Sequence, residues 1–124
     1  MLFRSDVGGG ASILGVLSGT DGNPITIGKN TLLGANSTCG IPLGDGCIID
    51  GGVAIFAGTK LTITSEERAK INIANPKSSL ENKEIFRADE LQGLNGLHFR
   101  QDSLTGKLIA RDRKSTRLNS SHRL

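Results

Sequence analysis

The stretch ITIGKNTLLGANSTCGIPLGDGCIIDGGVAIFAGTKLTI, residues 25–63, decides the fold because its aliphatic residues recur every six positions. The residues that open the units are Ile27, Leu33, Leu43, Ile49, Ile55 and Leu61. A helix repeats every 3.6 residues and a strand every two, so neither produces this period. A solenoid of short parallel strands does, because each unit forms one face of a triangular coil. We therefore predict an all-β fold, a left-handed parallel β-helix with these aliphatic residues in its core.

Small or β-branched residues follow the aliphatic residues at a fixed distance of four positions. They are Thr31, Ser37, Cys47, Val53 and Thr59. We expect them to fill tight corners beneath the aliphatic layer. The spacing breaks once, because Leu33 and Leu43 are ten residues apart, which predicts an irregular corner near residues 39–42.

Composition agrees with a thin coil and excludes other classes. The chain has 17 Gly and 4 Phe but neither Trp nor Tyr, whereas a globular core of this size usually uses more aromatic bulk. No apolar stretch approaches the roughly 20 residues of a membrane span, and the start carries no secretory pattern. We expect a cytoplasmic protein without a membrane partner. Cys39 and Cys47 are interpreted as corner-filling free thiols in preference to a disulfide.

The basic charge is confined to one end of the chain. The net charge of +3 would ordinarily suggest a polyanionic partner, but residues 1–111 hold 11 basic and 11 acidic side chains. The excess lies in residues 112–124, DRKSTRLNSSHRL, which include His122. The first eleven of these residues resemble the translation of a sequencing-library adapter. We expect this tail to be non-native and unpacked, and we expect no nucleic-acid partner.

The remaining segments suggest a truncated solenoid with a cap. Residues 1–63 form the coils, including one further unit at residues 14–18 and a projecting loop at residues 19–24. We expect more coils before Met1, since an open first coil leaves strand edges unpaired. Residues 64–84 are polar and predict an exposed excursion with one short strand at residues 70–73. Residues 85–111 alternate again, which predicts a small C-terminal antiparallel β meander that caps the solenoid.

The side chains offer few catalytic groups. There is no phosphate-binding loop, and Gly8-Gly9-Gly10 lacks the helix that a dinucleotide fingerprint requires. His98 is the sole histidine outside the tail, so a three-histidine zinc site is excluded. On an alternating strand we interpret it as a partly exposed structural residue. The glycine corners remain, and their backbone groups can hold an extended cofactor arm and polarise a carbonyl oxygen.

Several motifs resemble one enzyme family. The stretch GGGASILGVLSG, the repeat LLGANS and the later FRADELQGLNGLHFRQDSLTG are similar to tetrahydrodipicolinate N-succinyltransferases, and the resemblance covers residues 7–111. It implies a cytosolic homotrimer in lysine and diaminopimelate biosynthesis. The implied reaction moves succinyl from succinyl-CoA to the amine of L-2-amino-6-oxopimelate, so the partners are small-molecule substrates.

The resemblance also implies a set of succinyl-CoA-binding positions. These are Gly9, Ser12, Ala35, Asp50, Gly51, Gly58, Arg87, Arg100, Gln101, Asp102 and Ser103. Three depart from the usual pattern: Arg87 stands where relatives often have Lys, Asp50 replaces a frequent Glu, and Asp102 replaces Asn. The family's catalytic carboxylate and its magnesium ligands would precede Met1. The chain is therefore expected to hold no catalytic residue or metal ligand and to be inactive alone.

Two alternatives stay open. Another CoA-dependent hexapeptide acyltransferase would be expected to carry a catalytic histidine within its coils. A non-catalytic β-solenoid would be favoured by a flat Thr-x-Thr array, which the coils lack.

Overall fold

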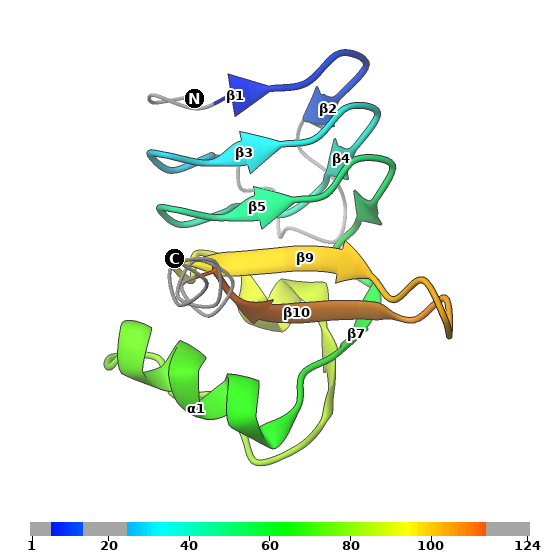
Figure 1. The fold of residues 1–124 in the computed structure, drawn as a ribbon. Helices are drawn as coiled ribbons and strands as arrows, with labels where there is room; N and C mark the ends of the chain where they lie inside the picture. Colours follow the sequence, from blue (N-terminus) through cyan, green and yellow to red (C-terminus); the bar gives the residue numbers. More distant parts are fainter. Residues whose placement is uncertain (1–5, 14–24, 114–124) are drawn as a thin grey trace, which may run out of the picture.

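Short parallel strands stack into coils in the computed structural model, which describes residues 6–13 and 25–113 (Figure 1). One face is formed by β1 (Asp6–Val7), β3 (Leu32–Leu33) and β5 (Ile48–Ile49). A second face is formed by β2 (Ser12–Ile13), β4 (Thr38–Cys39) and β6 (Ala54–Ile55). The parallel hexapeptide coil predicted from the six-residue period is confirmed.

The coil that starts at Ile27 advances the chain by sixteen residues, whereas the first described coil advances it by 26, from Asp6 to Leu32. Leu32 pairs with Ile48, Thr38 pairs with Ala54, and an isolated bridge joins Ile27 to Leu43. Two sides of the coil take six residues, and the third side, from Cys39 to Leu43, takes four. The ten-residue break in the repeat is therefore one full side followed by one short side.

The core is made of the aliphatic residues that open the six-residue units. All six are at most 4% exposed: Ile27, Leu33, Leu43, Ile49, Ile55 and Leu61. Of the predicted corner residues, Thr31, Ser37, Cys47 and Val53 are buried and Thr59 is half-buried. Both cysteines are buried free thiols, as expected, and burial raises the pKa of each to about 11.

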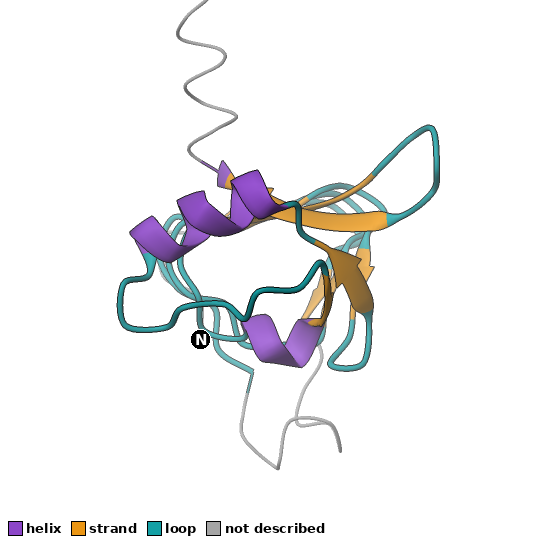
Figure 2. Cartoon of the chain, turned by 90° about the horizontal axis from the view of Figure 1, so that it is seen from below, coloured by secondary structure: helices purple, strands orange, loops and turns teal. Residues whose placement is uncertain are grey.

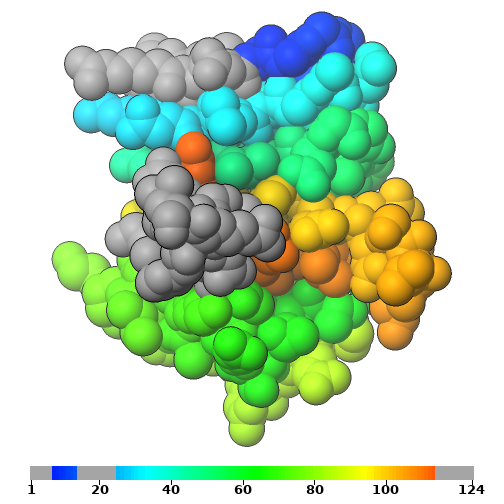
Figure 3. Space-filling view, viewed as in Figure 1, coloured from blue at the N-terminus to red at the C-terminus, as the bar shows by residue number. Residues whose placement is uncertain are grey.

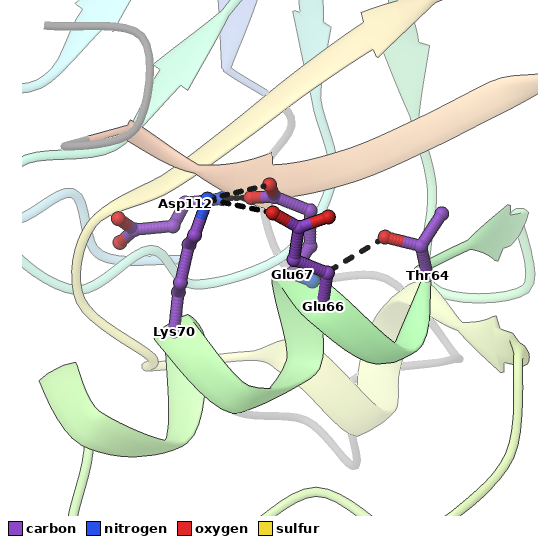
Figure 4. A network of polar contacts seen from close by, with 5 residues as sticks. All are labelled: Thr64, Glu66, Glu67, Lys70 and Asp112. Carbon is purple, nitrogen blue, oxygen red and sulfur yellow. Dashed lines mark hydrogen bonds and ion pairs between the residues drawn. The ribbon is translucent and has the colours of Figure 1, made fainter. Parts of the chain in front are cut away.

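The segment predicted as an exposed excursion contains a helix, and the strand expected at residues 70–73 is wrong. Helix α1 spans Ser65–Ala74. The Thr64 hydroxyl caps it by accepting a hydrogen bond of 3.3 Å from the Glu67 amide, and Glu66 and Glu67 occupy the first turn (Figure 4). A Thr followed three residues later by Glu is a helix-start signal that could have been read from the sequence. Ile71 anchors the helix with a fully buried side chain.

The cap has the predicted strands in a different arrangement. Its elements are β7 (Lys60–Thr62), β8 (Ile85–Arg87), the short helix η2 (Ala88–Leu91), β9 (Leu97–Gln101) and β10 (Leu108–Asp112). They do not form one antiparallel meander. Strand β9 pairs in parallel with β5, in the place where the next coil would continue, and β10 then pairs antiparallel with β9 and parallel with β7. The first face thereby becomes a seven-stranded sheet with β8 at its edge.

Phe86 and Phe99 fill the capped end of the core, where both side chains are fully buried. Viewed along the coil axis, α1 and η2 lie on different sides of the coil (Figure 2). Within the described residues, no helix has the length and apolar character needed to cross a membrane.

The expectation that the tail is unpacked is wrong at its first two residues. Asp112 ends β10, is 5% exposed, and its amide donates a 2.8 Å hydrogen bond to Glu67 Oε1 (Figure 4). The Arg113 amide donates to the Gly96 carbonyl at 2.8 Å. The remainder of the predicted tail with His122, the unit at residues 14–18 and the loop at residues 19–24 lie outside the described residues.

Candidate functional site

Successive coils turn the same corner between the first and second faces, and the turns lie one above another. They comprise residues 8–10, 34–36 and 50–52, which we call the turn ridge. The Asn36 amide donates to the Gly9 carbonyl at 2.9 Å, and the Gly52 amide donates to the Ala35 carbonyl at 2.9 Å. Gly9, Ala35 and Gly51 are exposed, so the ridge presents backbone to solvent.

Small residues are required on this ridge for two physical reasons. Gly52 has φ +75° and Asn36 φ 57°, conformations that residues other than Gly, Asn and Asp rarely adopt. A Cβ atom on Gly34 would overlap the Gly51 backbone, lying 2.7 Å from its Cα. The coils therefore stack at backbone contact distance, which leaves their outer surface open to an extended ligand.

A hollow of about 420 Å³ lies where the ridge meets the hairpin between β9 and β10. Its lining residues are Asp50, Gly51, Val53, Gln101, Asp102, Ser103 and Gly106. The hairpin projects from the body of the molecule in the space-filling view (Figure 3). Ridge and hairpin tip therefore form the two walls of one surface depression.

Asp102 shapes the hairpin tip. Its Oδ1 accepts a 2.8 Å hydrogen bond from the Leu104 amide, and its carbonyl accepts another of 2.8 Å from the Gly106 amide. The bond from Leu104 is the main cause that lowers the pKa of the exposed Asp102 carboxyl. Gln101 adds a 2.9 Å bond from Nε2 to the Gly106 carbonyl. The side chains facing the hollow are thus held by their own turn.

His98 joins the hollow through Asp50. Its Nε2 lies 2.6 Å from Asp50 Oδ1, and His98 is 8% exposed. The interpretation of His98 as partly exposed is therefore wrong. Sequence reasoning missed the pair because 48 positions separate the two residues, and they meet only because β9 pairs with β5.

The structure brings most of the predicted cofactor residues together. Those on the ridge and around the hollow are Gly9, Ala35, Asp50, Gly51, Gln101, Asp102 and Ser103. Ser12 begins β2 on the adjoining face, where its amide donates to the Ser37 carbonyl at 2.8 Å. Arg100 precedes Gln101 in β9, and its buried Nε has no hydrogen-bond partner in the described part of the chain.

Gly58 and Arg87 lie apart from that group. Gly58 is in the turn that follows β6, and a Cβ atom there would lie 3.8 Å from Arg87 Nη2. Arg87 is exposed and pairs with Asp89 at 3.2 Å. These two predicted residues form a separate small group at another corner of the coil.

The chemistry available at the hollow is mainly hydrogen-bond acceptance. Two carboxylates line it, and the other polar side chains are an amide and a hydroxyl. Across residues 6–13 and 25–113 there is no group of three side chains of the kind that could hold a metal ion. The depression can therefore bind an extended ligand that bears N–H groups, with no metal centre formed by the described residues.

Comparisons with known proteins confirm the family resemblance. Residues 24–57 match a family model described as "Hexapeptide repeat of succinyl-transferase". The chain is 69% identical over 113 residues to the 2,3,4,5-tetrahydropyridine-2,6-dicarboxylate N-succinyltransferase of Sulfurovum sp. (strain NBC37-1), covering 91% of this chain and 28% of that protein. It is 63% identical over 117 residues to the protein of the same name from Sulfurimonas denitrificans, covering 94% and 29%.

A solved structure supports the same resemblance. The crystal structure of a 2,3,4,5-tetrahydropyridine-2-carboxylate N-succinyltransferase from Campylobacter jejuni superposes with a TM-score of 0.82 at 56% identity, covering 90% of this chain and 29% of that one. The chain thus spans less than a third of the length of the relatives that it matches.

Proposed function

We propose that this chain is the C-terminal, cofactor-binding part of a tetrahydrodipicolinate N-succinyltransferase with a left-handed parallel β-helix. The observation that carries the proposal is the depression itself. Seven residues that the family resemblance assigns to succinyl-CoA, drawn from four separate segments, meet along the turn ridge and its hollow. The identity of 69% to the Sulfurovum relative supports the same assignment.

In the proposed reaction, the amine nitrogen of L-2-amino-6-oxopimelate attacks the thioester carbonyl of succinyl-CoA. A C–N bond forms, the C–S bond breaks, the coenzyme leaves with the sulfur, and the amine gives up a proton. Backbone amides of the coil corners stabilise the negative charge that develops on the thioester oxygen. The proton goes to a carboxylate that the family resemblance implies before Met1.

The hollow is suited to the amide-bearing arm of the coenzyme and not to its phosphates. Asp50 and Asp102 both line it, and their negative charges repel phosphate while they accept hydrogen bonds from N–H groups. We assign the phosphates to Arg100 and Arg87, whose guanidinium groups pair with phosphate oxygens. The arm would then run along the ridge towards Gly9.

The position of Arg87 supports a site shared between copies. Gly58 and Arg87 lie at another corner of the coil than the ridge, so a neighbouring subunit that presents them to the cofactor accounts for their place in the predicted set. A homotrimer with its clefts between subunits meets this requirement. The cytoplasm is the compartment proposed for this biosynthetic enzyme. Magnesium, which the resemblance implies, has no ligand group in the described residues, so no step is assigned to it.

The test is a hybrid enzyme. The stretch of the Sulfurovum relative that matches this chain is replaced by the residues of this chain, which is feasible at 69% identity. We expect the hybrid to transfer succinyl from succinyl-CoA to the acceptor amine and to bind coenzyme A in calorimetric titration. A matched hybrid carries Ile73→Ala, a change at an exposed helix position outside the depression. It controls for effects on coenzyme A binding that any substitution in the hybrid would cause. A folded hybrid that does not bind coenzyme A would overturn the proposed function.

A further inference from the structure

We propose that His98 is a positioning residue for the cofactor arm. It holds the Asp50 carboxylate at the mouth of the hollow, where the carboxylate accepts a hydrogen bond from an N–H group of the arm. This inference rests on the proposed function and adds to it a residue that neither the family resemblance nor the relatives assign.

The strand pairing places the two side chains together. In the register between β5 and β9, His98 lies opposite Ile48 and Phe99 lies opposite Ile49. Asp50 follows directly, and its amide donates a 3.0 Å hydrogen bond to the Phe99 carbonyl. The His98 ring then meets Asp50 Oδ1 at 2.6 Å. Strand β9 thus fixes both the backbone and the side chain of Asp50.

The hydrogen bonding settles the direction of the contact. An ionised carboxylate only accepts hydrogen bonds, so His98 Nε2 carries the hydrogen and donates it. The other ring nitrogen, Nδ1, is buried without a hydrogen-bond partner among the described residues. Nε2 is therefore the ring nitrogen through which His98 holds Asp50.

The two side chains of the pair differ in how much of each is exposed to solvent. The His98 side chain is 10% exposed, whereas the Asp50 side chain is 42% exposed and lines the hollow. A ligand in the hollow therefore meets Asp50 and does not meet the buried ring. With Oδ1 engaged by His98, the carboxylate retains lone pairs for further donors. His98 consequently acts on the ligand through Asp50, which distinguishes it from a catalytic base.

The experiment compares two replacements of His98 in the hybrid enzyme. His98→Leu removes the donor, and we expect the Kd for coenzyme A and the KM for succinyl-CoA to rise about tenfold, because Asp50 is no longer oriented. His98→Gln supplies a side-chain N–H donor, and we expect it to restore both constants to within about threefold. Melting temperatures, measured in parallel, report any loss of packing separately.

A second comparison separates positioning from direct contact. Asp50→Ala alone should weaken coenzyme A binding about tenfold, and adding His98→Leu to it should cause no further loss, since His98 acts only through Asp50. Additive losses, or a lower melting temperature in His98→Leu with unchanged Kd and KM, would overturn the inference and leave the proposed function intact. Absence of coenzyme A binding by the unchanged hybrid would overturn both.

Discussion

Two glycine-to-alanine changes on the turn ridge distinguish a glycine that coil packing requires from a glycine that cofactor binding requires. Gly9 is exposed, its φ is outside the left-handed region, and a Cβ atom there would meet nothing within 4 Å. Gly34 lies one coil further on, where a Cβ atom would lie 2.7 Å from the Gly51 Cα and 2.8 Å from the Asp50 carbonyl carbon. The same added methyl group therefore enters open space at one position and packed backbone at the other.

The expected magnitudes follow from this contrast. Gly9→Ala should leave the free energy of unfolding unchanged or raise it by about 0.4–1 kcal/mol, because alanine restricts the unfolded chain. Gly34→Ala should lower it by about 1–3 kcal/mol, since the backbones of two coils must move apart. For a domain of this size each kcal/mol shifts the melting temperature by about 4–8 °C. Thermal unfolding followed by circular dichroism measures both variants.

Binding should follow the opposite order. If the cofactor arm lies along the ridge, the methyl group of Gly9→Ala stands in its path, and we expect the Kd for coenzyme A to rise about tenfold, or about 1.4 kcal/mol. Calorimetric titration of the hybrid enzyme gives this value. An unchanged Kd in Gly9→Ala would show that the arm does not pass over Gly9. An unchanged melting temperature in Gly34→Ala would refute the backbone contact between coils.

Three further predictions concern charge. Arg87→Ala and Arg100→Ala should each weaken coenzyme A binding about ten- to a hundredfold in calorimetry, and the loss should shrink at high salt; unchanged affinity in both would remove them from the site. Burial raises the pKa of Cys39 and Cys47 from 9.0 to about 11, so their contribution to stability is complete below pH 9 and is lost as the pH rises towards 11. Denaturant titrations across that range should show the decline, and rapid thiol labelling of the folded protein at pH 8 would contradict it. The pKa of Asp102 is lowered from 3.8, so its stabilising contribution is lost only as the pH falls below about 4; Asp102→Asn should flatten that acid limb in melting curves.

Local periodicity was sufficient to predict the coil from the sequence. The six aliphatic residues that open the units are all buried because every unit repeats one backbone geometry and stacks on a neighbouring unit of the same kind. The start of α1 also depends on a local sequence signal, since Thr64 and Glu67 form a cap within four residues. The strand expected at residues 70–73 resulted from overlooking that signal. The cofactor positions followed from family motifs.

Only the tertiary structure decided how the cap joins the coil. Strand β9 pairs antiparallel with β10, and its other edge could have paired with β8 in a meander. Its parallel pairing with β5 instead depends on burying Phe99 beneath Ile49 across some fifty residues of intervening chain. No pattern within either segment encodes that choice, because alternation specifies which face a side chain takes but not which strand lies beside it. The hydrogen bond between His98 and Asp50, and hence the character of the hollow, exists only through this long-range pairing.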